Sequence, residues 1–172
     1  MPSLLIRNCR LFDASEVSAS QSVLVRDGRI DAVVSAEPRT RADKVLDAGG
    51  RTLAPGFIDV HIQGAGGVDV LDATPEALET LSRTCARFGV TGFLGTTVYM
   101  TGQENVHLRV AAKCMGRDLG GARLLGVHLE GPFISREKRG MIQPDCLAPP
   151  SQAALDHIES LLGDGLKMMT VA

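Results

Sequence analysis

The sequence has few of the residues that mark several common functions. It contains no tryptophan and one tyrosine, so it lacks the aromatic platforms on which single-stranded nucleic acids stack. Its 18 Lys and Arg nearly balance 20 Asp and Glu, which argues against the basic surface that nucleic-acid binding requires. No apolar run approaches the roughly 20 residues that span a bilayer, and the N-terminus has too short an apolar stretch for a secretory signal. We therefore expect a cytoplasmic protein with no nucleic-acid or membrane partner.

Cysteine is also scarce. The residues Cys9, Cys85, Cys114 and Cys146 lie far apart and form no C-x-x-C pair, which gives no metal-cluster or redox motif. A chain of 172 residues with 44% hydrophobic residues is long and apolar enough to form a core without disulfide bonds. We therefore expect four reduced, mostly buried thiols.

Residues 1–55 have the short apolar runs and glycine turns of a β unit. The pair Asp27-Gly28 separates the runs 22–26 and 29–34, and Asp-Gly between two such runs is a strong hairpin signal. A second turn, at Gly49-Gly50, follows the short run 44–47. The pattern predicts a small antiparallel β unit over residues 1–55.

After Gly56 the pattern changes to apolar strands that alternate with amphipathic helices. Thr74 and Pro75 have the N-cap and first-turn residue types of a helix start. Alternating strands and helices predict β-α-β units around a parallel sheet buried on both faces. We therefore predict an α/β domain over residues 56–172. Its expected strands are 57–62, 92–97, 123–130 and 166–171, and its expected helices are 74–89, 103–115 and one that begins after 150.

The first expected strand ends in the sequence His61-Ile62-Gln63. Alternation along a strand places His61 and Gln63 on one face, at the end of a parallel sheet where catalytic groups collect. Imidazole is a good ligand for zinc or iron, so His61 is either a metal ligand or a hydrogen-bonded structural residue. Asp59 precedes this pair, either orienting a ligand or capping a turn.

The third expected strand ends in the sequence His128-Leu129-Glu130, followed by a strand-breaking Gly-Pro. Three roles are open for Glu130: a metal ligand, a general acid or base, or an ion pair with Arg136 or Arg139. The hydroxyl groups of Thr96 and Thr97, at the end of the second strand, either contact a ligand or cap the next turn. The other two histidines, His107 and His157, are expected on solvated helix surfaces.

Several stretches together resemble a known family. Residues 53–64 (LAPGFIDVHIQG) are similar to the first barrel strand of the amidohydrolase superfamily, and the β unit before them is similar to its small N-terminal sandwich. Residues 126–133 (GVHLEGPF), followed by Lys138-Arg139-Gly140, resemble the N-acetylglucosamine-6-phosphate deacetylases more specifically. Residues 66–69 and 91–96 fit the same family.

This resemblance implies the N-terminal part of a (β/α)8 metal-dependent hydrolase barrel, preceded by a small β-sandwich unit. It implies hydrolysis of the N-acetyl amide of N-acetylglucosamine 6-phosphate, giving glucosamine 6-phosphate and acetate. By resemblance, Glu130 is a metal ligand, and His61 with Gln63 matches the family's first-strand metal pair. Gln63 stands where two-metal members have a second His, which favours one bound metal. Zinc is expected first, with iron, manganese or cobalt as alternatives, and the full-length relatives imply a homo-oligomer.

The sequence departs from the family in two places. The substrate-binding positions after Gly140 are Met141 and Ile142, and Ile142 stands where the family has a His that holds the substrate. The family's remaining metal-binding histidines and its general acid–base aspartate lie on later strands, beyond Ala172. The resemblance therefore predicts no catalytic residue within this chain, an incomplete barrel, and an inactive chain when it is alone.

Two other functions remain open. The chain can be a non-catalytic protein that binds a sugar phosphate or completes a barrel with a second polypeptide. It can also be another amide hydrolase of the amidohydrolase superfamily, such as a dihydroorotase-like enzyme. The His-Leu-Glu-Gly-Pro-Phe stretch disfavours the latter, because those enzymes usually use a carboxylated lysine on a later strand.

Overall fold

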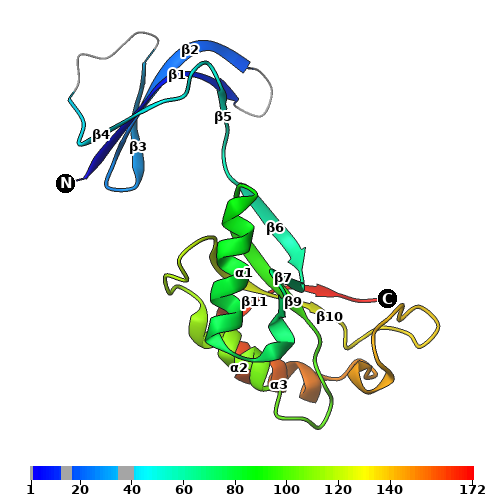
Figure 1. The fold of residues 1–172 in the computed structure, drawn as a ribbon. Coiled ribbons are helices and arrows are strands. Elements are labelled where there is room, and N and C mark those ends of the chain that lie inside the picture. Colours follow the sequence, from blue (N-terminus) through cyan, green and yellow to red (C-terminus); the bar gives the residue numbers. More distant parts are fainter. Residues whose placement is uncertain (1, 13–16, 35–40) are drawn as a thin grey trace. The chain divides into compact units, whose positions relative to one another are not determined.

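The computed structural model describes residues 2–12, 17–34 and 41–172. The chain forms two compact units, Met1–Pro55 and Gly56–Ala172 (Figure 1). Each unit is built around a sheet of its own. No helix in the described ranges is long and apolar enough to cross a membrane.

The first unit is a single sheet in the order β3-β2-β1-β4, with β5 also paired to β1. Its strands are β1 (Ser3–Phe12), β2 (Val17–Arg26), β3 (Arg29–Val34), β4 (Lys44–Asp47) and β5 (Thr52–Leu53). The predicted hairpin is confirmed: β2 and β3 pair antiparallel, with Arg26 opposite Arg29. Asp27 and Gly28 have φ angles of 50° and 74°, and positive φ at both central residues is what the tight two-residue hairpin turn requires.

The purely antiparallel arrangement predicted for this unit is wrong, because β4 and β5 each run parallel to β1. The Gly49-Gly50 turn does not reverse the chain between them. Instead the backbone N–H groups of Ala48 and Gly50 donate to the carbonyls of Arg7 and Asn8 on β1. The two glycines, at φ of 58° and 76°, therefore let one continuous segment follow β1 through a kink.

The second unit is built on a four-stranded sheet in the order β11-β10-β9-β6. All three pairings are parallel, which confirms the predicted α/β class. Because the spatial order of these strands follows the chain order, each helix connects neighbouring strands. The elements are β6 (Phe57–Ile62), β7 (Gly64–Ala65), β8 (Val68–Asp69), η1 (Val70–Asp72), α1 (Pro75–Arg87), β9 (Val90–Thr97), α2 (Val106–Cys114), β10 (Arg123–Glu130), η2 (Pro144–Cys146), α3 (Gln152–Leu162), η3 (Gly163–Gly165) and β11 (Leu166–Thr170).

Two of the three helices, α1 and α3, begin where the sequence predicts, whereas α2 begins at Val106 rather than at residue 103. Thr74 caps α1, its Oγ1 accepting a hydrogen bond from the N–H of Ala77 at 3.2 Å, and Pro75 is the first helical residue. Ser151 caps α3 in the same way. Satisfying an otherwise unpaired N–H at a helix start contributes about 1 kcal/mol.

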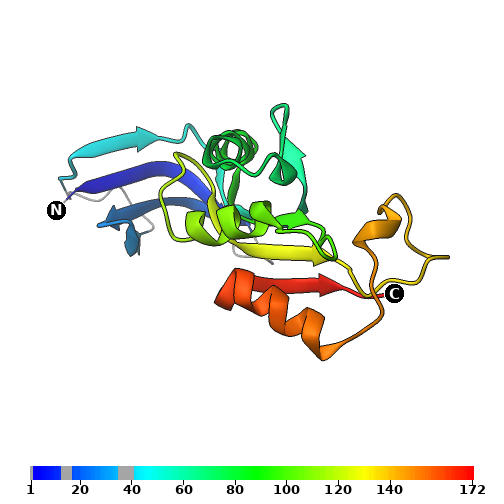
Figure 2. The same cartoon turned by 90° about the horizontal axis from the view of Figure 1, so that it is seen from below.

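All three helices pack against one face of the sheet. Figure 2 shows α3 alongside β11, which lies next to β10. Strand and helix residues share one buried cluster, whose largest members include Phe93, Val127, Leu129, Leu81, Leu108 and Ile158. Burying each such side chain stabilises the fold by about 1.5–3 kcal/mol.

The opposite face of this sheet carries no helix among the described residues, and only part of it is buried. Leu125 follows a core residue, Leu124, on β10 and therefore points the other way, where it is 40% exposed. The expectation of a sheet buried on both faces is therefore met only in part by the described residues. His128 is buried on the second face whereas Leu125 is exposed there, because all three helices lie on the same side.

Candidate active site

Polar side chains from three strands meet on this second face, at the carboxyl end of the sheet. Leu129 on β10 is fully buried in the core. Its neighbours His128 and Glu130 therefore project to the opposite face, where they meet His61 and Gln63 at the end of β6 and Thr170 at the end of β11.

Two side chains contact Glu130: His61, on β6, and Gln63, which directly follows β6. The Gln63 amide Nε2 donates to Glu130 Oε2 at 2.6 Å, and His61 Nε2 lies 3.7 Å from Oε1. The Glu130 side chain is 21% exposed, so one edge of the carboxylate remains open to a ligand. Among the described residues, the side chain against the Glu130 carboxylate is that of His61, and neither Arg136 nor Arg139 forms the ion pair that the sequence left open.

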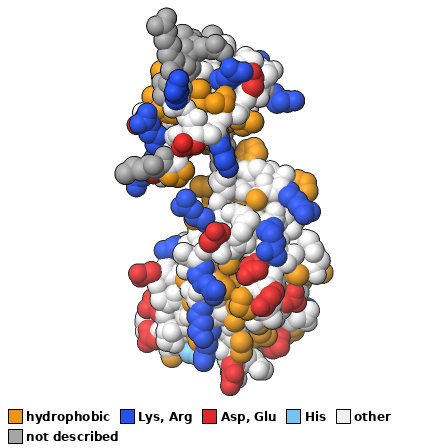
Figure 3. Space-filling view, turned by 60° about the vertical axis from the view of Figure 1, so that its left-hand side comes forward, with side chains coloured by type: hydrophobic (Ala, Val, Ile, Leu, Met, Phe, Trp, Pro, Cys, Tyr) orange, Lys and Arg blue, Asp and Glu red, His pale blue; other side chains and the backbone are white. Residues whose placement is uncertain are grey.

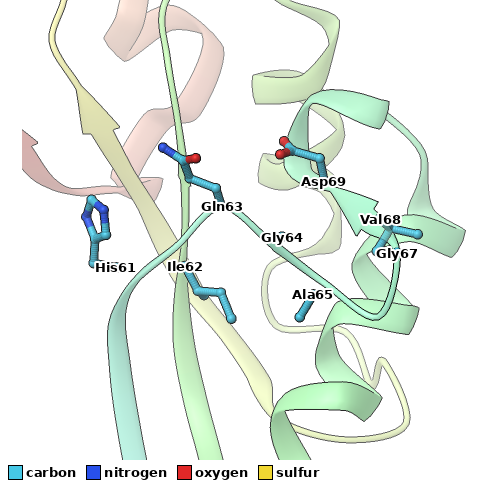
Figure 4. A pocket seen from close by; sticks show the side chains of 8 residues that line it. All are labelled: His61, Ile62, Gln63, Gly64, Ala65, Gly67, Val68 and Asp69. Atoms are coloured by element: carbon cyan, nitrogen blue, oxygen red, sulfur yellow. The ribbon is translucent and has the colours of Figure 1, made fainter. Parts of the chain in front are cut away.

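Figure 4 shows how β6 presents these groups. His61 and Gln63 extend from the strand end in the same direction, while Ile62 between them turns the other way. Asp69 extends from β8 on the far side of the same hollow. Asp59 bonds within its own strand: its Oδ1 accepts a hydrogen bond from the backbone N–H of His61 at 3.0 Å.

His128 links strands that are not neighbours in the sheet. Its Nδ1 lies 2.9 Å from the carbonyl oxygen of Val60 on β6, and its Nε2 lies 2.9 Å from Thr170 Oγ1 on β11. Since β9 lies between β6 and β10, this buried imidazole reaches across a whole strand. No role in the site was predicted for either His128 or Thr170.

A cavity of about 730 Å³ adjoins this cluster. Gln63 and Glu130 line it, together with the loop that carries Met141 and Ile142. Both of those predicted substrate-binding residues thus lie at the cavity. Ile142 is held by Arg139, which accepts from the Ile142 N–H and donates through its guanidinium to the Ile142 carbonyl. Met141 is 94% exposed.

Thr96 and Thr97 line the same cavity from the end of β9. Both are buried, and neither hydroxyl has a hydrogen-bond partner within the described ranges. They therefore do not cap the next turn. Of the two roles that the sequence left open, contact with a ligand is the one that would satisfy these hydroxyl groups.

The donor atoms around Glu130 are a partial set for a metal ion. Within the described residues, no group of three or more His, Cys, Asp or Glu side chains is arranged to hold one. One carboxylate, one imidazole and one amide are nevertheless donor types that divalent ions accept. The cluster therefore fits part of a coordination shell, and a tightly bound ion needs further ligands.

Burial shifts the pKa of other titratable groups near the core. All four cysteines are unpaired and buried, as predicted. Burial, and then the charge of Asp145, raises the pKa of the Cys146 thiol at the cavity, which disfavours the reactive thiolate. The expectation that His107 is solvated is wrong: it is buried, its Nε2 lies 2.8 Å from the Val98 carbonyl, and burial lowers its pKa.

Comparison with known proteins identifies the relatives of the chain. No family model matches it. Over 99% of its length it is 32% identical to the N-acetylglucosamine-6-phosphate deacetylase of Lysinibacillus sphaericus, and over 80% of its length it is 42% identical to the human protein of that name. The chain is homologous to the N-terminal part of N-acetylglucosamine-6-phosphate deacetylases. It spans 44% of the Lysinibacillus deacetylase and 34% of the human one.

Solved structures agree with this relationship. The deacetylase of Pasteurella multocida matches 98% of the chain with a TM-score of 0.84 and 24% identity, and 44% of that deacetylase is covered. A mutant of the Mycobacterium smegmatis deacetylase, in complex with N-acetyl-D-glucosamine-6-phosphate, matches the whole chain with a TM-score of 0.83 and 24% identity, again over 44% of its length. A dihydroorotase matches 99% of the chain less closely, with a TM-score of 0.56 and 17% identity, over 42% of its own length.

Proposed function

We propose that this chain forms the N-terminal part of a metal-dependent hydrolase that removes acetate from N-acetylglucosamine 6-phosphate, leaving glucosamine 6-phosphate. The observation that carries this proposal is Glu130, held by His61 and Gln63 at the mouth of a 730 Å³ cavity. A carboxylate at the carboxyl end of a parallel sheet is where barrel hydrolases place their catalytic groups.

We also propose that the sheet is an arc of a (β/α)8 barrel. Its strands follow one another in chain order, as strands of such a barrel do. The bridge from His128 to Val60 requires β6 and β10 to approach each other across β9, which a curved sheet allows. The exposed apolar residues of the second face then belong to the barrel interior.

The proposed metal ligand is Glu130, with His61 and Gln63 beside it, and zinc is the proposed ion. A bound divalent ion lowers the pKa of its water toward about 7, which supplies the nucleophile for amide hydrolysis. Glu130 supplies the negative charge, and the cavity walls exclude bulk water from the amide. The other described carboxylates at the cavity, Asp69 and Asp145, are engaged with the Leu71 N–H and the Cys146 thiol, so we propose that these 172 residues are inactive alone.

The cavity suits a small, charged, polar ligand. Lys138 lines it and places a positive charge that favours a phosphorylated sugar. Met141 and Ile142 are the proposed contacts with the sugar. We propose that the protein acts in the cytoplasm, where its buried thiols stay reduced, and that it assembles as a homo-oligomer.

The test is release of acetate from N-acetylglucosamine 6-phosphate by the product of the complete reading frame. The expected result is turnover that falls at least about 100-fold in Glu130→Gln and is unchanged in Glu76→Gln, an exposed carboxylate in the first turn of α1. Zinc binding without turnover would favour the non-catalytic alternative. Turnover of dihydroorotate instead would favour another amide hydrolase of the superfamily.

The same assay on the 172-residue chain tests the proposal that it is inactive alone. No acetate release is expected from the chain by itself. Acetate release that Glu130→Gln abolishes would contradict this part of the proposal, because the described residues would then suffice for catalysis.

A further inference from the structure

The hydrogen bonds around His128 fix which of its ring nitrogens carries a proton. A backbone carbonyl only accepts hydrogen bonds, and the Val60 carbonyl lies 2.9 Å from His128 Nδ1. His128 Nδ1 must therefore carry the proton. The other nitrogen, Nε2, lies 2.9 Å from Thr170 Oγ1, and a hydroxyl can donate to it. The neutral imidazole of His128 thus donates through Nδ1 and accepts through Nε2.

This proton position constrains the next imidazole. His61 Nδ1 lies 3.4 Å from His128 Nδ1, and the two rings meet edge to face with centroids 5.0 Å apart. A proton on His61 Nδ1 would set two N–H groups against each other. His61 Nδ1 therefore presents its lone pair to His128, and in the neutral ring the proton is then on Nε2. That nitrogen faces Glu130 Oε1, 3.7 Å away.

We propose that His128 is a positioning residue: it fixes the tautomer of His61, so that His61 presents an N–H to Glu130 rather than a lone pair to a metal ion. The Glu130 carboxylate then accepts a hydrogen bond from Gln63 at 2.6 Å on one oxygen. On the other oxygen it faces His61 Nε2 at 3.7 Å, an electrostatic contact longer than a hydrogen bond. An outer donor of this kind orients a carboxylate ligand. Building on the proposed function, this means that the ion at Glu130 is bound without His61, which suits one metal ion rather than two.

Thr170 keeps the His128 ring in this orientation. Rotating the imidazole by half a turn would place carbon atoms against both Val60 and Thr170 and lose both hydrogen bonds. His128 is also 4% exposed, so lost hydrogen bonds would not be replaced by water, and each buried unpaired group costs about 1–3 kcal/mol. The tautomer is thus fixed from both sides of the ring.

Long-range ¹⁵N–¹H correlation spectra of the ¹⁵N-labelled, metal-free chain at neutral pH test the proposal, because they distinguish a protonated ring nitrogen from one with a lone pair. His61 is expected to be protonated at Nε2 and His128 at Nδ1. In His128→Asn the amide N–H replaces the donor at Nδ1, so the His61 pattern should persist. In His128→Gln that donor is lost, so His61 should show a mixture of both tautomers.

A protonated Nδ1 on His61 in the unsubstituted chain would overturn the proposal, as would an unchanged His61 pattern in His128→Gln. Should His128→Gln fail to fold, Thr170→Val and Thr170→Ser replace this pair. In Thr170→Val, His61 should show a mixture of both tautomers, and in Thr170→Ser it should stay protonated at Nε2. The same single tautomer in both variants would contradict a role for Thr170.

Zinc titration separates this proposal from the proposed function. When zinc chloride is added, the protonation pattern of the His61 nitrogens should not change. His61→Ala should weaken zinc binding by about 10-fold, because it removes a residue that orients the Glu130 ligand. Direct coordination would shift a His61 nitrogen and would overturn the proposal. Absence of any zinc binding would count against the proposed metal site, while the metal-free spectra would still decide the role of His128.

Discussion

The two faces of the parallel sheet in the second unit differ in what they contribute. On the helix face of β10, Leu129 is fully buried in the core. On the other face of the same strand, Leu125 is 40% exposed, and His128 and Glu130 carry the hydrogen bonds of the candidate site. One face thus holds the core and the other holds the candidate site, and single strands contribute to both because their side chains alternate.

One side of the second unit is mixed in charge. Figure 3 shows Lys and Arg side chains among Asp and Glu side chains on that side. A mixed surface of this kind provides little attraction for a polyanion. The chemically distinctive groups are therefore those of the second sheet face rather than those of this surface.

The largest effect on stability is expected from the helix face. Leu129→Ala should lower the free energy of unfolding by about 2–5 kcal/mol, because it leaves a cavity in the core. Leu125→Ala, on the same strand, should cost at most about 1 kcal/mol, because its side chain is already partly in water. Urea unfolding of both variants measures the difference, and equal losses would break the distinction between the faces.

The largest effect on ligand binding is expected from the other face. Glu130→Gln should weaken zinc binding by at least about 100-fold, while Glu76→Gln leaves it unchanged. The fall corresponds to about 2.8 kcal/mol of binding free energy. Isothermal titration calorimetry compares the variants, with unfolding curves recorded beside it. Equal zinc affinity in the two variants would remove Glu130 from the site.

A moderate effect of pH on stability is expected from His107, a buried residue of α2. Burial lowers its pKa, so the unfolded chain takes up a proton before the folded chain does. Stability should therefore be full above the ordinary value of 6.5 and fall as pH drops below it, with a slope of at most about 1.4 kcal/mol per pH unit.

The control for this pH effect is His107→Gln, which keeps a polar side chain without a group that titrates in this range. Urea midpoints measured above and below pH 6.5 should depend less on pH in this variant than in the unsubstituted chain. The same dependence in both would exclude His107 as its source.

The smallest effect is expected at the start of α1. Thr74→Ala removes the hydroxyl that accepts from the Ala77 N–H and should cost about 1 kcal/mol. Thr74→Ser retains the acceptor and should be close to neutral. Thermal unfolding of the pair checks this, and zinc affinity should not change in either, since the cap lies on the helix side.

Local signals in the sequence predicted much of the fold. Thr74-Pro75 and Asp27-Gly28 act through their own backbone conformation and nearest hydrogen bonds, and both structures are present. Strand pairing in the first unit was harder to predict, because β4 and β5 pair with β1, which is distant from them in the sequence. The Gly49-Gly50 turn alone does not indicate that pairing.

The candidate site was predictable in part. Ile62 is partly buried against the core and Leu129 is fully buried. Strand alternation from these two residues places His61, Gln63 and Glu130 on one face, and the structure brings these three together. The contact of His128 with Val60 was not predictable, because it depends on how β6 and β10 approach across β9. No local pattern marks Thr170 as the second partner of that ring.

Anomalous X-ray diffraction from crystals of the protein grown with zinc tests most directly whether the candidate site on the second sheet face binds a metal ion. A zinc peak is expected about 2.0–2.2 Å from a Glu130 carboxylate oxygen, with His61 outside the coordination shell. No peak at Glu130, with zinc bound elsewhere in the molecule, would contradict the assignment of Glu130 as the metal ligand.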